Sequence, residues 1–259
     1  MRFWELWKTG NPYGRSSSFS NDPVIVNGTM YWDTLRHFFE IKQGIVKSKN
    51  KKAALRVSEL THGALISDFW TSMAICLRVP YIIEMTELLE CRKKFLKSFQ
   101  KEEVYNLTGN QFENFNTIFQ LYSLVQKRPW ILEKADTLLL TPDLFNYFLT
   151  GEKKAEYTMA TTTQLMDAKN KVWSDRILEA LQIPKKILPE IVPSGTVVGT
   201  LQPSICEELG VEPAKVIAIT GHDTQSAVVS VPTQEKDFIF ISCGTWSLFG
   251  TELDGPIIG

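Results

Sequence analysis

The C-terminal part of the chain alternates apolar stretches with short polar turns, and this alternation constrains the fold more than any other feature. Val216–Thr220 is expected to form a buried strand, Gly221–Thr224 a turn, Gln225–Val231 a helix and Phe238–Ser242 a second strand, with a further turn at 244–245. Alternating strands and helices, with polar residues gathered at strand ends, are typical of α/β folds. We therefore expect an α/β protein.

Most of the preceding sequence has a helical hydrophobic pattern. Pro23–Val26 is expected to form a strand before a turn at Asn27 and Gly28. Helices are expected over Trp32–Ile45, Lys101–Leu107, Asn116–Val125, Trp130–Ala135, Leu138–Phe148, Trp173–Leu181 and Ile205–Leu209. The helix at Leu138–Phe148 is expected to stop at Gly151. Residues 56–92 show no clean period of 2 or 3.6 and predict no element.

Composition narrows the possible partners. With 28 basic and 29 acidic residues, the chain has no electrostatic reason to bind nucleic acid or an anionic membrane. The 4 cysteines form no C-x-x-C pair, so we expect neither a disulfide framework nor a protein-held metal site. The start of the chain does not resemble a signal peptide, and the apolar stretch Met73–Met85 is short and interrupted by Arg78. These features predict a cytoplasmic protein.

The turn at Gly221–Thr224 contains the residues best suited to chemistry. An Asp between a strand end and a helix start has a fixed backbone and lies beside free N–H groups. Asp223 is in this position, and His222 and Thr224 on either side can form hydrogen bonds. The structural alternative is that Asp223 or Thr224 only caps the helix, and that His222 is an ordinary loop histidine.

A second turn, Ser242–Ser247, follows the next strand and contains Gly244 and Thr245. Glycine-bearing turns with hydroxyl groups can hold phosphates through their backbone N–H groups. Most Gly-Thr turns are ordinary hairpins, however, and that alternative stays open.

Together and in this order, the two turns resemble a known family. Thr220–Val228 (TGHDTQSAV) and Ile241–Gly250 (ISCGTWSLFG) are similar to the substrate and nucleotide turns of the FGGY carbohydrate kinases, in particular the rhamnulokinase branch. Other similar segments are Tyr31–Leu35, Gln111–Thr117, Pro142–Gly151 and Tyr157–Leu165. The resemblance covers residues 19–55 and about 97–259. It implies the first domain of the actin/hexokinase-like (ribonuclease H-like) sugar-kinase fold, in an incomplete form.

The resemblance also implies an activity. Asp223 would be the general base that takes the proton from the C1 hydroxyl of L-rhamnulose, yielding L-rhamnulose 1-phosphate in rhamnose catabolism. His222 and Thr224 would position the sugar together with Asp223, and Gly244 and Thr245 would contact ATP. Phosphoryl transfer depends mainly on positioning and charge neutralisation, and Mg²⁺ bridging the phosphates is implied by that chemistry. Two alternatives remain: an inactive product of a decayed gene, and a kinase for another ketose such as L-fuculose.

The sequence departs from the family in three places. Family members begin with a strand and turn of the form D-L-G-A-S-S-G-R and continue into a second domain, and the present sequence contains neither. In residues 57–91, where relatives have a run I-G-I-D-T-W-G-V-D, the chain reads Val57–Trp70 (VSELTHGALISDFW). We therefore expect a truncated copy, with residues 1–232 as an N-terminal domain lacking its first strand and residues 236–259 as the start of a C-terminal domain.

We interpret residues 57–91 as translated out of frame. When the last nucleotide of each codon is joined to the first two of the next, Phe69–Trp70 gives Leu, Trp70–Thr71 gives Asp and Met73–Ala74 gives Gly. With free codon choice the stretch then permits the family run. The alternative is a divergent insertion with its own structure. If the stretch is out of frame, its replaced strands should leave the chain unstable and without kinase activity.

Overall fold

The computed structural model describes residues 22–27, 29–49, 67–70, 85–235, 237–243 and 247–258. The strands in these ranges are β1 Val24–Val26, β2 Thr29–Tyr31, β3 Ser67–Trp70, β4 Thr137–Leu140, β5 Lys154–Glu156, β6 Met166–Asp167, β7 Val172–Trp173, β8 Glu190–Val192, β9 Val197–Thr200, β10 Lys215–Ile217, β11 Ile239–Cys243 and β12 Ser247–Thr251.

Helices occupy much of the remaining described sequence. They are α1 Thr34–Lys49, α2 Met85–Ser98, α3 Lys101–Thr108, α4 Thr117–Lys127, α5 Pro129–Lys134, α6 Thr141–Thr150, α7 Tyr157–Thr162, α8 Asp175–Leu181, α9 Pro203–Leu209 and α10 Asp223–Val229, with a short 3₁₀ helix at Lys185–Ile187. The mixture of strands and helices agrees with the expected α/β class.

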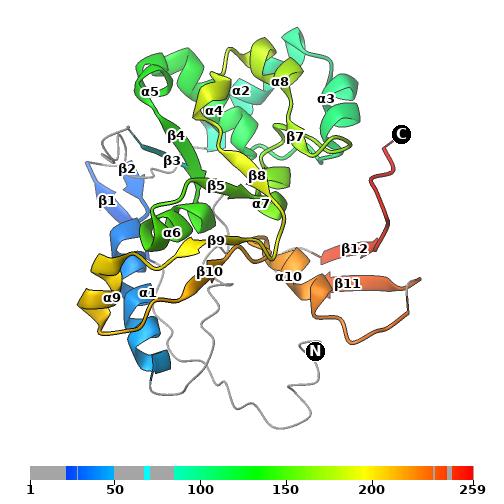
Figure 1. Ribbon diagram of the computed structural model, residues 1–259. Coiled ribbons are helices and arrows are strands. Elements are labelled where there is room, and N and C mark those ends of the chain that lie inside the picture. The colour runs from blue at the N-terminus through cyan, green and yellow to red at the C-terminus, as the bar shows by residue number, and fades with distance from the viewer. Residues whose placement is uncertain are drawn as a thin grey trace.

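The strands form short ladders. β5 and β8 run parallel, with Ala155 opposite Ile191, and the connection between them contains α7, β6, β7 and α8. The pairs β1–β2, β3–β4, β6–β7, β9–β10 and β11–β12 are antiparallel. In Figure 1, α2, α3, α4, α5 and α8 gather at one end of the molecule, α1 and α9 lie at the other, and β4, β5 and β8 lie between them.

The main hydrophobic core lies among the first group of helices. The rings of Phe95 (α2) and Phe119 (α4) meet at a centroid distance of 6.0 Å, and Ile177 and Leu178 of α8 belong to the same buried cluster. A second cluster joins the three helices α1, α6 and α9 through Ile41, Ile45, Phe145, Leu149 and Ile205. Leu138 of β4 and Ala155 of β5 belong to the first core, and Val216 of β10 packs against the second, so the two cores contact different strands.

The expected helix over Leu138–Phe148 is wrong in its first part. Thr137–Leu140 is a fully buried strand, and the helix begins only at Thr141. A helix from Leu138 would place Pro142 beyond its first residues, where the proline ring collides with the carbonyl of residue 138. The helix ends as expected, since Gly151 adopts φ 81°, a left-handed conformation that glycine adopts without steric cost.

Several other boundaries differ from expectation. Helix α2 begins at Met85, inside the stretch that predicted no element, and Trp173 lies in β7 rather than in the helix α8 that follows it. The predicted buried strand Val216–Thr220 is a shorter strand, β10, in which Val216 is half-buried and Ile217 exposed. β10 pairs with β9 alone among the described strands, so its faces are less covered than those of a central strand.

The predicted out-of-frame stretch lies mostly outside the described residues. Within it, β3 pairs antiparallel with β4, with Phe69 opposite Leu138, and Leu88 and Cys91 of α2 are buried. Burial raises the pKa of the Cys91 thiol. His37 is buried in α1 with its ring 6.5 Å from that of Phe145, and burial lowers its pKa.

Candidate functional site

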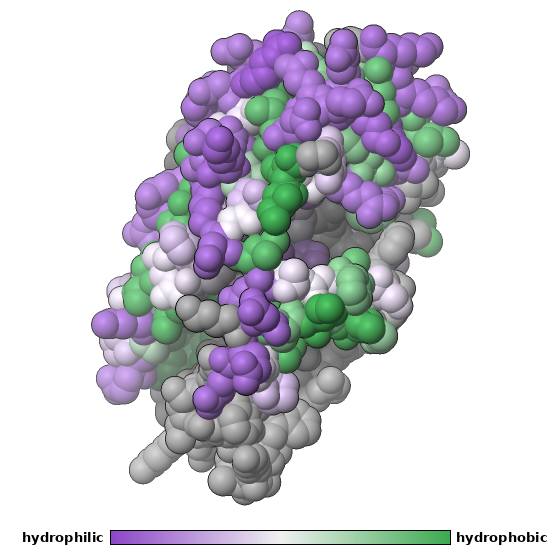
Figure 2. Space-filling view, turned by 90° about the vertical axis from the view of Figure 1, so that its right-hand side faces the viewer, coloured by the Kyte–Doolittle hydropathy of each residue, from purple (hydrophilic) through white to green (hydrophobic). Residues whose placement is uncertain are grey.

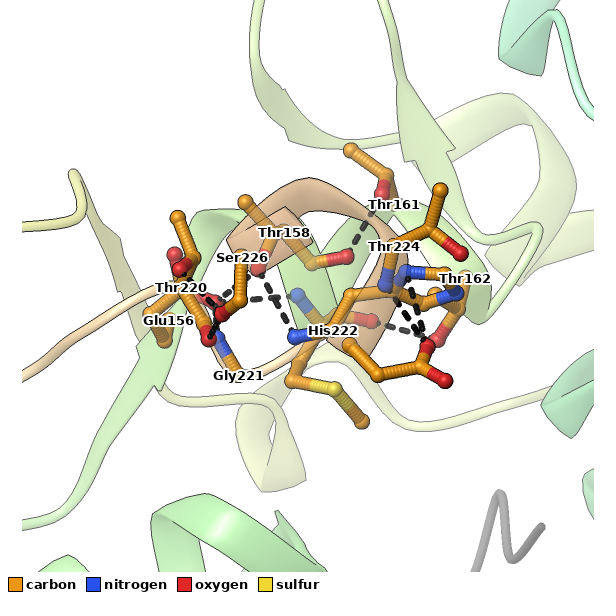
Figure 3. A network of polar contacts seen from close by, with 11 residues as sticks. Glu156, Thr158, Thr161, Thr162, Thr220, Gly221, His222, Thr224 and Ser226 are labelled. Carbon is orange, nitrogen blue, oxygen red and sulfur yellow. Dashed lines mark hydrogen bonds and ion pairs between the residues drawn. The ribbon is translucent and has the colours of Figure 1, made fainter. Parts of the chain in front are cut away.

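The turn that contains His222 and Asp223 connects β10 to α10 (Figure 3). The sequence predicted a turn over Gly221–Thr224 and a helix from Gln225, whereas α10 begins two residues earlier, at Asp223. His222 occupies the N-cap position with φ −83° and ψ 126°, and its side chain makes no capping hydrogen bond. The alternative in which Asp223 or Thr224 is the cap residue is therefore wrong.

Asp223 presents its carboxyl group at the protein surface. Its side chain is 48% exposed, and Oδ1 accepts a hydrogen bond from the backbone N–H of Thr224 at 2.8 Å. The same oxygen lies 3.5 Å from Nδ1 of His222. The structure thus brings together the three residues that the sequence singled out here, with the carboxyl group open to a ligand and oriented by the first turn of α10.

Burial of His222 favours the neutral form of its imidazole. Burial lowers the pKa of the imidazole below 6.5, while the charges of Asp223 and Glu156 oppose this shift. Nδ1 of His222 and Oε1 of Gln225 are both buried and make no hydrogen bond within the described part of the chain. Buried polar atoms usually have partners, so these two atoms are candidates for ligand hydroxyl groups. Gln225 was not predicted from the sequence.

The turn is closed by contacts at its two ends. The hydroxyl groups of Thr220 and Ser226 lie 2.6 Å apart, and that of Ser226 lies within hydrogen-bond distance of the Thr220 carbonyl at 2.7 Å. Gly221 lies so close to α7 that a Cβ atom there would come within 2.6 Å of Cγ of Met159. The close approach requires glycine before His222.

A buried carboxylate lies beneath the turn. Glu156, the last residue of β5, is 1% exposed and accepts hydrogen bonds from Ser194 and from the backbone N–H of Gly221. The sequence analysis did not identify Glu156 or Ser194. A signal was available, because Glu156 directly precedes Tyr157–Leu165, one of the segments that resembles the family.

Asp143 of α6 lies next to Glu156 and is also buried. Oδ1 of Asp143 accepts a hydrogen bond from the backbone N–H of Glu156 at 3.0 Å, whereas Oδ2 has no hydrogen-bond partner among the described residues. Burial raises the pKa of Asp143 well above its ordinary value, and the charge of Glu156 adds to this shift against the effect of the backbone hydrogen bond. Asp143 is accordingly a buried acid that favours its neutral form.

Replacing Asp143 by asparagine is expected to remove a pH-dependent loss of stability. The unfolded chain releases this proton near pH 3.9, whereas the folded chain retains it to a higher pH, so the contribution of Asp143 to stability falls as pH rises above about 4. The melting temperature of Asp143→Asn relative to the unsubstituted protein should therefore increase between pH 4 and pH 8. Thermal unfolding across this range measures the effect, and a difference independent of pH would contradict it.

Asp136 provides a control of opposite sign. Hydrogen bonds from Lys153 and Thr137 lower its pKa, although burial opposes them. Its stabilising contribution is present above the unfolded-state pKa and is lost as pH falls. Asp136→Asn should therefore be less stable than the unsubstituted protein at neutral pH, and the deficit should shrink towards pH 3.

The second predicted site lies at the β11–β12 hairpin. The two strands pair antiparallel, with Cys243 opposite Ser247. Gly244 and Thr245 lie outside the described residues, and their role in ATP binding stays a prediction. In the part of the chain that is described, no three His, Cys, Asp or Glu side chains cluster as metal ligands, and no helix is long and apolar enough to cross a membrane.

Known structures share this fold. A ligand-bound xylulose kinase from Lactobacillus acidophilus superposes with a TM-score of 0.77 at 19% identity, covering 93% of this chain and 50% of that chain. A xylulose kinase from Rhodospirillum rubrum gives a TM-score of 0.68 at 15% identity, covering 87% and 48% of the two chains. The predicted actin/hexokinase-like fold is confirmed.

Sequence comparison gives the family. The rhamnulokinase of Oceanobacillus iheyensis is 38% identical over 245 residues, and that of Halalkalibacterium halodurans is 37% identical over 247 residues. Each match covers 92% of this chain, and the chain spans about half the length of these curated relatives. Residues 82–230 match the N-terminal domain of the FGGY family of carbohydrate kinases. This match includes the turn at His222 and Asp223 and the buried Glu156 beneath it, and the chain therefore belongs to the FGGY family of carbohydrate kinases.

Proposed function

We propose that this chain provides the sugar-binding domain of a cytoplasmic, ATP-dependent ketose kinase that converts L-rhamnulose to L-rhamnulose 1-phosphate. The observation that carries the proposal is the pairing of an exposed carboxyl group on Asp223 with a neutral, partly exposed imidazole on His222 at a braced turn. Similarity to two proteins named rhamnulokinase favours L-rhamnulose as the sugar.

Asp223 is assigned the role of general base. A carboxylate at the surface can accept the proton of a sugar hydroxyl as that oxygen attacks phosphorus, and such proton transfer contributes roughly 10²- to 10⁴-fold to the rate. In this reaction the hydroxyl O–H bond would break and its proton would go to Asp223, while a new O–P bond forms and the bond from the γ-phosphorus to the bridging oxygen of ATP breaks, releasing ADP. The hydrogen bond from the Thr224 N–H fixes the carboxyl group against the start of α10.

His222 and Thr224 are assigned to sugar positioning. A neutral imidazole offers one donor and one acceptor, which suits a polyhydroxylated ligand better than a charged ring. The buried Nδ1 of His222 and Oε1 of Gln225 have no hydrogen-bond partner among the described residues. We include Gln225 among the residues that would bind sugar hydroxyl groups, because an unsatisfied buried acceptor gains free energy from such a contact.

ATP and Mg²⁺ are proposed cosubstrate and cofactor. ATP would supply the phosphoryl group, and Mg²⁺ would neutralise phosphate charge. The described residues fit the sugar side of the site only, because Gly244 and Thr245, the proposed ATP contacts, lie outside them.

We also propose that residues 1–232 belong to the N-terminal domain and residues 236–259 to the start of the C-terminal domain. The family match ends at residue 230, close to this boundary. Beyond it, Ile239, Ile241, Phe249 and Ile257 expose most of their surface. In Figure 2, apolar residues reach the surface near the middle of the view, among polar and neutral ones. Exposed apolar residues in such numbers are typical of a surface that another domain covers.

The test is turnover of candidate sugars by the purified 259-residue chain with Mg²⁺-ATP. ADP release that depends on L-rhamnulose, with product phosphorylated at O1, would support the proposal. A preference for L-fuculose would show that L-fuculose, rather than L-rhamnulose, is the substrate. Sugar binding without turnover would support the sugar-binding role alone, and neither binding nor turnover would favour an inactive remnant of the family.

A further inference from the structure

Glu156 connects three segments of the chain beneath the candidate site. Oε2 accepts hydrogen bonds from the Thr158 hydroxyl at 2.5 Å, the Met159 N–H at 3.1 Å and the Gly221 N–H at 3.2 Å. Oε1 accepts one from the Ser194 hydroxyl at 2.5 Å. Four donors therefore converge on one carboxylate from the start of α7, the β8–β9 connection and the turn before α10. Figure 3 labels Glu156 together with two of these donors, Thr158 and Gly221.

This arrangement reaches His222 by two routes. Gly221, which donates to Glu156, is the residue before His222. The N–H of His222 itself donates to the Thr158 hydroxyl at 3.3 Å, and that hydroxyl donates to Glu156. Two successive backbone N–H groups of the turn are thus fixed by one side chain, directly and through Thr158.

The cost of burying Glu156 indicates a specific role. A carboxylate removed from water is unfavourable unless hydrogen bonds compensate it, and a well-packed apolar residue is usually as stable in such a place. The four groups that donate hydrogen bonds to the Glu156 carboxylate all belong to chain segments next to the turn. Two of its hydrogen bonds, from Thr158 and Met159, cap the start of α7, and the bond from Gly221 joins that end of the helix to the turn.

We propose that Glu156 is a positioning residue, whose carboxylate fixes the backbone of Gly221 and His222 and thereby the direction in which His222 and Asp223 face the sugar. The part of this inference that concerns sugar rests on the function proposed above. The part that concerns the turn stands on the hydrogen bonds alone, and the two parts have separate measurements.

Two substitutions of Glu156 separate the effect of its side-chain length from the effect of its charge. Glu156→Asp keeps the charge but shortens the side chain by one bond of about 1.5 Å, so that the contact with Gly221 is lost. Glu156→Gln keeps the length, with its carbonyl oxygen able to accept from Gly221 and its amide group able to donate to Ser194, but it removes the charge. Glu87→Asp on α2 is the matched control, because Glu87 also accepts a hydrogen bond from a serine hydroxyl group, that of Ser123.

Amide hydrogen exchange followed by NMR tests the turn. In Glu156→Asp, the N–H groups of Gly221 and His222 should exchange at least about tenfold faster, while core amides such as those of Leu139 and Ile177 keep their rates. Glu156→Gln and Glu87→Asp should leave the two turn amides within about threefold of the unsubstituted protein. Uniform acceleration of core and turn amides in Glu156→Asp, or no acceleration, would overturn the proposal.

The pKa of His222 should respond to the two substitutions in the opposite order to the exchange rates, changing more in Glu156→Gln than in Glu156→Asp. Because Glu156 and Asp223 both raise the pKa of this imidazole against the effect of burial, Glu156→Gln should lower its titration midpoint, and Glu156→Asp should change it less.

The affinity for L-rhamnulose, measured by calorimetry, should fall at least about tenfold in Glu156→Asp and stay within about threefold in Glu156→Gln.

These outcomes distinguish the inference from the proposed function. If the unsubstituted chain binds no L-rhamnulose, the proposed sugar is wrong, and hydrogen exchange still decides the role of Glu156 in the turn. If the chain binds the sugar and affinity follows charge rather than reach, falling in Glu156→Gln and not in Glu156→Asp, Glu156 acts electrostatically and the positioning role is wrong.

Discussion

Replacing Asp223 by asparagine is expected to lower kcat for sugar phosphorylation by about 10²- to 10⁴-fold, the usual contribution of a general base. Asparagine has the size of aspartate, and its side-chain oxygen can still accept the Thr224 N–H, but it cannot take the proton of a sugar hydroxyl. The dissociation constant for L-rhamnulose should therefore change by less than about tenfold. Initial rates of ADP release and calorimetric titration with the sugar measure the two effects.

Asp175 provides the matched control for this substitution. It is the first residue of the seven-residue helix α8, as Asp223 is of α10, and its exposed carboxylate pairs with Lys185 at 2.5 Å. Exposed ion pairs contribute about 0–1 kcal/mol, so Asp175→Asn should fold normally and keep full activity. If Asp223→Asn retained a third or more of the rate, the general-base assignment would be wrong.

The largest expected effect on stability comes from Phe119 in the main core. Its side chain is fully buried, and its ring meets that of Phe95 at 6.0 Å and that of Phe112 at 6.5 Å. Phe119→Ala leaves a cavity among side chains that cannot close around it, at a cost of about 3–5 kcal/mol. For a chain of this size the melting temperature should fall by roughly 6–20 °C, as measured by thermal unfolding.

Phe249→Ala makes the same chemical change at the surface. Phe249 of β12 is 73% exposed, so its removal should change stability by no more than about 0.5 kcal/mol. An equal loss from both substitutions would show that the aromatic cluster around Phe119 does not dominate the stability of this chain.

Elements with strong local patterns could be predicted from the sequence. Helices α3 and α4 lie within one or two residues of their predicted ranges, and the Gly151 stop is where it was expected. Local signals suffice here, because an apolar stripe at helical spacing and a glycine at a left-handed position act within a few residues. The polar turn before α10 was predicted on the same basis, two residues too long.

Ambiguous apolar runs could not be assigned in this way. Leu138–Leu140 fits a buried strand or a helix equally well, and its pairing with β3 selects the strand. The exposure of Ile217 depends on which neighbours cover β10, and no pattern within the strand itself contains that information.

The sequence by itself determined the class of fold and the family resemblance, and it predicted His222, Asp223 and Thr224 as the centre of a site. Only the tertiary structure placed Glu156 beneath them, because Glu156 and Gly221 lie 65 residues apart and meet through the parallel pairing of β5 with β8 and the position of α7. The physical reason is that a periodic pattern records the environment of a residue but not its partner. Hydrogen bonds between distant segments exist only once strands and helices have packed.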